Sequence, residues 1–172
     1  MKSQKNLFIL RLINVALFVV LIFIQYSSNF SLKIKVANPM LPLALLVSIC
    51  MFYSEIRGAV TGLIVGVFVD AYSSTPSGLN AILFMLLGLA AVLIIKHLFN
   101  NNVLSAIALC FICSQIYFVF RWLFTFAFYT TFTENISYLL NTAIPSSLYT
   151  SILIIPFYYF EKFLFKKFYN TH

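Results

Sequence analysis

Residues 58–70 read Gly-Ala-Val-Thr-Gly-Leu-Ile-Val-Gly-Val-Phe-Val-Asp, and this stretch decides the fold. Glycine recurs every fourth residue at Gly58, Gly62 and Gly66, and the next step of four reaches Asp70. On an α-helix a step of four residues turns by about 400°, so these positions form one slowly drifting stripe. Small residues at this spacing let a second helix backbone approach closely inside a membrane. Two interpretations stay open: packing against another helix of this chain, or a groove for a partner's transmembrane helix.

The glycine stripe lies in a short apolar segment between two turns. Residues 55–58 form a charged turn before it, and the Ser-, Thr-, Pro- and Gly-rich residues 73–78 form a turn after it. The segments 39–54 and 58–72 are each about 15 residues long, against the roughly 20 residues that cross a bilayer. We therefore expect these two segments to form a short helical hairpin that carries the contact surface, with the other helices holding it in place.

Apolar segments on both sides of this hairpin predict an all-α membrane protein, a bundle of about six transmembrane helices in a single domain, residues 1–172. The expected spans are residues 7–26, 39–54, 58–72, 79–95, 103–129 and 138–160. Residues 161–172 are expected to be a basic, aromatic tail. An outer-membrane barrel is disfavoured because these runs are longer than its ~10-residue alternating segments.

The composition excludes a water-soluble protein. Hydrophobic residues make up 62% of the chain and charged residues 9%, whereas soluble domains have about 25% charged residues. The net charge is +7, but most basic residues flank apolar runs, which indicates membrane topology and contact with anionic lipid rather than nucleic-acid binding.

The distribution of basic residues predicts the orientation. If the N-terminus is cytoplasmic, the inner segments contain eight basic residues and the outer loops contain two. The inner set is Lys2, Lys5, Arg11, Arg57, Lys96, Lys162, Lys166 and Lys167, and the outer set is Lys33 and Lys35. By the positive-inside rule, both termini are expected in the cytoplasm.

Asp70 is the only acidic residue within an expected span, and a charge there needs a partner. Arg121 lies about 18 residues into the fifth span, which corresponds to ~27 Å along a helix and to the same leaflet as Asp70. Three roles for Asp70 stay open: a proton or ion relay, a helix cap near the interface, and an ion pair. Our hypothesis is an Asp70–Arg121 ion pair that joins the third span to the fifth. Asn14, Gln115 and other polar residues in the spans are expected to make interhelical hydrogen bonds.

No catalytic, metal-binding or cofactor-binding pattern is present in the sequence. Cys110 and Cys113 have the spacing of a redox pair, but they and Cys50 lie in apolar runs and are expected to be small apolar helix residues. His97 and His172 lie at or beyond span ends without acidic or cysteine partners at metal-ligand spacing. We expect a protein that is not an enzyme and that needs no cofactor.

Residues 55–88 closely resemble the signature of MreD, the bacterial family of rod shape-determining membrane proteins. The matching positions are Glu55, Arg57, Gly58, Gly62, Gly66 and Asp70, then Pro76-Ser77-Gly78-Leu79-Asn80-Ala81 and Gly88, with Asn38-Pro39 before them. One departure is Leu89, where the family often has an aromatic residue.

The resemblance implies a scaffold of the cell-elongation complex, which builds peptidoglycan, in the bacterial cytoplasmic membrane. It implies binding to MreC within the membrane, and membership of the complex that couples MreB filaments to RodA and a class B penicillin-binding protein. It also implies a fold like the substrate-binding component of energy-coupling-factor transporters. The residues expected in partner binding or helix packing are Gly58, Gly62, Gly66, Asp70, Gly78 and Asn80.

A second function from another class is the substrate-binding membrane subunit of a vitamin-type transporter. Such subunits carry small residues at four-residue spacing on the first span, where they dock on their partner. Here the first span has Ala16 flanked by the bulky Leu12 and Val20, which counts against this alternative.

Overall fold

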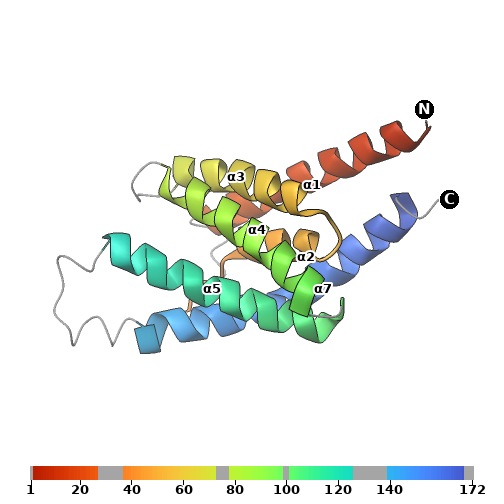
Figure 1. The fold of residues 1–172 in the computed structure, drawn as a ribbon. Helices are drawn as coiled ribbons and strands as arrows, with labels where there is room; N and C mark the ends of the chain where they lie inside the picture. Colours follow the sequence, from red (N-terminus) through yellow and green to blue (C-terminus); the bar gives the residue numbers. More distant parts are fainter. Residues whose placement is uncertain (1, 27–36, 73–77, 99–100, 126–138, 169–172) are drawn as a thin grey trace.

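The computed structural model describes residues 2–26, 37–72, 78–98, 101–125 and 139–168 (Figure 1). In these ranges it contains α-helices, one π-helical turn and no β-strand, which confirms the all-α class. The elements are α1 (Lys2–Tyr26), α2 (Leu41–Cys50), α3 (Glu55–Tyr72), α4 (Leu79–Leu98), α5 (Val103–Thr125), the π-helical turn η2 (Leu139–Ala143) and α7 (Ile144–Phe168). Most of the expected turn at 73–78, most of the loop at 27–38 and the loop at 130–137 lie outside the described residues.

Three described helices are long and apolar enough to cross a membrane. The candidate spans are Leu79–His97 in α4, Val103–Phe124 in α5 and Asn141–Phe168 in η2 and α7. The chain is therefore an all-α membrane protein. The apolar stretch of α1 is shorter, Leu12–Tyr26, and the 18-residue α3 carries three charged residues.

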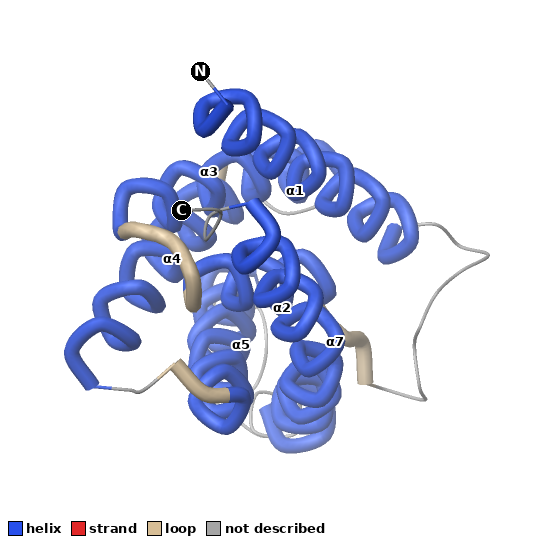
Figure 2. Tube along the Cα trace, turned by 90° about the vertical axis from the view of Figure 1, so that its right-hand side faces the viewer, coloured by secondary structure: helices blue, strands red, loops and turns tan. Residues whose placement is uncertain are grey.

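Helix α2 is the buried centre of the bundle. Its ten residues extend only ~15 Å, half of the ~30 Å hydrocarbon core, so the second span expected at 39–54 is corrected to a half-length helix. All ten residues are buried, because a helix that is apolar on every side can be covered on every side. Figure 2 shows α2 in the middle of the bundle, and it contacts each of the other five α-helices.

Helix α3 pairs with α4 and not chiefly with α2, which corrects the expected hairpin. The contact between α3 and α4 is the most extensive between any two described helices, and the two helices lie side by side along their length (Figure 1). Helix α1 makes only sparse contacts with α2, α3 and α7.

The expected tail after residue 160 is also corrected, because α7 continues to Phe168. Both termini lie at the same end of the bundle as the α2–α3 and α4–α5 connections (Figure 1). We call this the termini end. The opposite end contains the end of α3, the start of α4 and the end of α5.

Candidate functional site

The glycine stripe of α3 faces the backbone of α4. A Cβ atom added at Gly62 would overlap the carbonyl group of Phe84, and one added at Gly66 would overlap the backbone of Asn80 and Ala81. These neighbours are main-chain atoms, which cannot move aside as the tip of a side chain can. The absence of a side chain at both positions therefore sets the distance between the two helices.

We call this contact between α3 and α4 the seam. It continues toward the termini end, where Gly58 meets Gly88. A Cβ at Gly58 would lie 2.7 Å from Cγ2 of Val92 and 2.9 Å from the carbonyl oxygen of Gly88, while a Cβ at Gly88 would overlap the carbonyl oxygen of Gly58. Cys50 of α2 places its thiol 3.4 Å from the same Gly88 oxygen. Of the two interpretations, the structure has packing within the chain, and α4 covers the stripe.

At the other end of the seam, Asp70 caps α4. Its Oδ1 accepts hydrogen bonds from the backbone N–H of Asn80 at 3.2 Å and from Asn80 Nδ2 at 2.8 Å. Its Oδ2 accepts from the backbone N–H of Ala81 at 2.9 Å. The first N–H groups of a helix have no partner within it and carry partial positive charge, so a carboxylate there is stabilising. Asp70 thus ties the end of α3 to the start of α4.

Asn80 extends this contact to α5. Its side chain is fully buried, and its Oδ1 accepts a hydrogen bond from the Tyr117 hydroxyl at 3.0 Å. The Tyr117 ring, also fully buried, packs edge-on against Phe84 with centroids 5.5 Å apart. The chain Asp70–Asn80–Tyr117 therefore connects three helices through polar groups inside the bundle.

The expected Asp70–Arg121 ion pair is not what the structure shows. Among the described residues the ion pair is Lys96–Glu55, at 2.7 Å, whereas both oxygens of Asp70 face the start of α4. Arg121 lies near the end of α5 and Asp70 near the end of α3, and these two helix ends share one end of the bundle (Figure 1). The two residues therefore lie toward the same end of the bundle, but the partner of Asp70 is the N-terminus of α4.

Gly78 contributes through its backbone conformation. Its φ angle is +90°, and a Cβ there would meet nothing within 4 Å. Residues with a side chain rarely adopt this φ, and glycine does so freely. Gly78 therefore lets the chain turn directly into α4, which begins at Leu79.

The start of α2 is capped by side chains from α1 and α7. No side chain at its own N-terminus caps it. The backbone N–H of Met40 donates to Thr150 Oγ1, that of Leu41 to Gln25 Oε1, and that of Asn38 to Ser146 Oγ, each at 3.0 Å. Nearby, Gln115 Nε2 of α5 donates to Ser147 Oγ of α7 at 2.5 Å. These serine and threonine positions in α7 were not singled out from the sequence.

Glu161 is the other residue that sequence reasoning missed. It belongs to the expected tail at residues 161–172, but it lies in α7 and is fully buried. Asn14 Nδ2 of α1 donates to its Oε2 at 3.5 Å. The available signal was helical spacing, since Ile154, Tyr158 and Glu161 lie on one face of a continuous helix.

The three cysteines are buried free thiols, and no group of three acidic, cysteine or histidine residues in the described part of the chain could hold a metal ion.

Comparison with known proteins gives one match. The model of a family described as rod shape-determining protein MreD matches residues 6–168 of this chain, which is nearly all of it. No curated protein and no solved structure matches.

Proposed function

The chain belongs to the MreD family of rod shape-determining membrane proteins, and from that premise we propose that it is a scaffold of the cell-elongation complex that binds MreC within the membrane. The proposed role is non-enzymatic and uses no cofactor. Through MreC, the complex would connect MreB filaments to RodA and a class B penicillin-binding protein during peptidoglycan synthesis.

The observation that carries this proposal is the extent of the family match. It begins at residue 6 and ends at residue 168, so it reaches every described helix and not only the glycine motif. The polar groups of the seam also suit a scaffold, because they bind helix termini and other helices. Asp70, Asn80 and Tyr117 hold α3, α4 and α5 in one arrangement.

We place the protein in the bacterial cytoplasmic membrane, with several crossings and both termini in the cytoplasm. The basic residues support this orientation, because Arg57, Lys96 and the lysines of α7 all belong to the termini end. Since α4 covers the glycine stripe, MreC would dock on side chains elsewhere on the surface of the bundle.

Depletion in the rod-shaped host tests the shape role. We expect depleted cells to round up and swell under phase contrast, and a plasmid copy to restore rods. Normal rods together with a vitamin auxotrophy would contradict the scaffold role and favour the transporter subunit.

Co-purification tests the partner. Tagged protein extracted in mild detergent is expected to retain MreC, while a tagged, unrelated multi-pass protein from the same membranes is not. Equal recovery of MreC in both samples would count against binding.

A further inference from the structure

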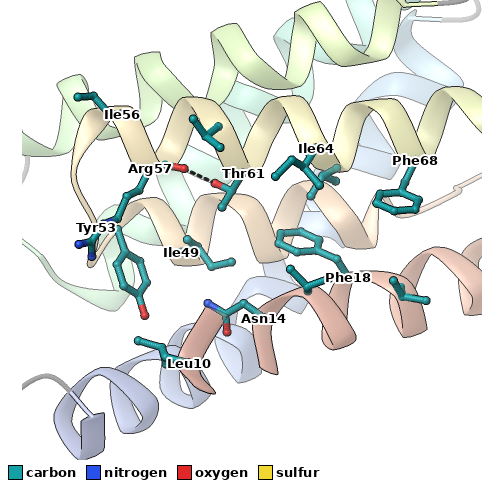
Figure 3. A pocket seen from close by; sticks show the side chains of 14 residues that line it. Leu10, Asn14, Phe18, Ile49, Tyr53, Ile56, Arg57, Thr61, Ile64 and Phe68 are labelled. Atoms are coloured by element: carbon teal, nitrogen blue, oxygen red, sulfur yellow. Dashed lines mark hydrogen bonds between the residues drawn. The ribbon is translucent and has the colours of Figure 1, made fainter. Parts of the chain in front are cut away.

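A cavity of about 430 Å³ lies between α1 and α3 and reaches the α2–α3 turn (Figure 3). One wall is formed by α1 side chains such as Phe18 and Val19, and the other by Ile64 and Phe68 of α3. Val19, Ile64 and Phe68 are also partly exposed on the surface of the bundle. In a membrane protein, a cavity between two such helices opens sideways toward the lipid.

The two ends of this cavity differ in chemistry. Arg57 and Tyr53 lie side by side at the termini end, and Asn14 of α1 lies between them and the part lined by Phe18, Ile64 and Phe68 (Figure 3). The Arg57 guanidinium lies over the Tyr53 ring, 5.9 Å from its centroid. Arg57 forms no ion pair with any described residue. The cavity is therefore cationic at one end and apolar along the rest, which fits an anionic amphiphile.

The length of the cavity matches one leaflet of a bilayer. Its lining on α3 runs from Ile56 to Phe68, twelve steps that extend ~18 Å along a helix. One leaflet of hydrocarbon is ~15 Å deep, half of the ~30 Å core. A partner's transmembrane helix would need a groove about twice as long, whereas one acyl chain with its head group at Arg57 needs this length.

Asn14 adds a polar group that lacks a partner. Its side chain is 7% exposed and lines the cavity. Its Nδ2 donates to Glu161, while its Oδ1 has no hydrogen-bond donor among the described residues. A buried acceptor without a donor is destabilising, and a hydroxyl of a bound head group would supply the missing donor.

We propose that this cavity binds one anionic phospholipid from the leaflet at the termini end, with its phosphate at Arg57, its head-group hydroxyls near Asn14 and an acyl chain between Phe18 and Phe68. The site does not depend on the binding of MreC. The bound lipid would fill the space between α3 and the sparsely packed α1.

Native mass spectrometry of the full-length protein tests this site. The protein is equilibrated in mixed micelles with equal amounts of phosphatidylglycerol and phosphatidylcholine. We expect one phosphatidylglycerol to stay bound, at least fivefold in excess over phosphatidylcholine. Equal retention of the two lipids by the wild type, or no retained lipid, would overturn the proposal.

Substitutions at two adjacent residues test whether the retained lipid binds in the cavity or on the general surface of the protein. Ile64→Trp fills the cavity and is expected to lower lipid retention at least tenfold. Leu63→Trp is the matched control, since Leu63 has a similar exposed fraction but does not line the cavity. Arg57→Gln is expected to remove the preference for phosphatidylglycerol while leaving retention of some lipid. Size-exclusion profiles and unfolding temperatures show whether each variant is folded, and equal lipid retention by folded Ile64→Trp and Leu63→Trp variants would contradict the site.

A crosslinking experiment tests whether the cavity holds a partner's transmembrane helix and not a phospholipid. Val15→Cys places a thiol at the cavity wall. The lipid proposal is overturned if this thiol crosslinks in membranes to a partner's transmembrane helix and the isolated protein retains no phospholipid. The cavity would then belong to that helix. A crosslink only to a thiol-reactive phospholipid analogue would support the lipid proposal.

Discussion

The smallest decisive feature of this molecule is the missing side chain at Gly62. Gly62→Ala puts a methyl group where the Phe84 carbonyl already lies, so α3 and α4 must separate. Overpacking of this kind typically costs about 1–3 kcal/mol, occasionally more. We expect a clearly lower unfolding temperature in detergent, measured by fluorescence-detected size exclusion.

Val67→Leu is the control for Gly62→Ala, because Val67 lies on the exposed face of the same helix. It should leave the unfolding temperature nearly unchanged. If the two variants behave alike, the seam is looser than the structure shows.

Asp70 and Arg121 provide a second test on single residues. Asp70→Ala leaves the first N–H groups of α4 and the Asn80 amide without their acceptor. Hydrogen bonds to a charged group contribute about 1.5–3 kcal/mol, so we expect a loss of stability of that size. Arg121→Gln removes no such contact and is expected to have a much smaller effect in the same detergent unfolding assay.

The double variant Asp70→Arg with Arg121→Asp sharpens this test. An ion pair tolerates exchange of its charges, but a helix N-terminus does not tolerate a cation. We expect no rescue of stability relative to Asp70→Arg alone. Recovery to wild-type stability would restore the ion-pair interpretation.

At the scale of elements, the short α2 depends on other helices for its N-terminal cap. Thr150→Val replaces the hydroxyl that accepts the Met40 N–H by a methyl group and leaves that buried N–H unpaired. We expect a loss of about 1–3 kcal/mol and faster amide hydrogen exchange in the first turn of α2. The control is Ile152→Val, two residues away on the exposed face of α7, and equal exchange in both variants would mean that Thr150 does not hold the cap.

At the scale of the whole molecule, the positions of the chain termini and of the helix connections predict the membrane topology. Both termini and two connections share one end of the bundle, and Arg57, Lys96 and the lysines of α7 lie there, whereas Arg121 lies at the opposite end. We expect green fluorescent protein fused after residue 172 to fluoresce, because it folds only in the cytoplasm. Alkaline phosphatase inserted between α5 and η2 should be active, because it needs the outer side. The reverse pattern would invert the proposed orientation.

Much of this architecture follows from the sequence alone. Apolar runs predicted the all-α membrane class and the positions of α4 and α5, because inside lipid each helix must satisfy its own backbone hydrogen bonds. The stripe from Gly58 to Asp70 predicted a close helix contact and the family. These features depend on local composition and spacing, which a single chain displays in full.

Only the tertiary structure decided which surfaces meet. Lipid tails are as apolar as a protein core, so hydropathy does not distinguish a side chain that faces lipid from one that faces another helix. For this reason the sequence did not reveal that α4 covers the glycine stripe or that α2 lies at the centre of the bundle. Asp70 follows the same logic: its charge predicted a partner, but only the position of α4 decided that the partner is a helix N-terminus.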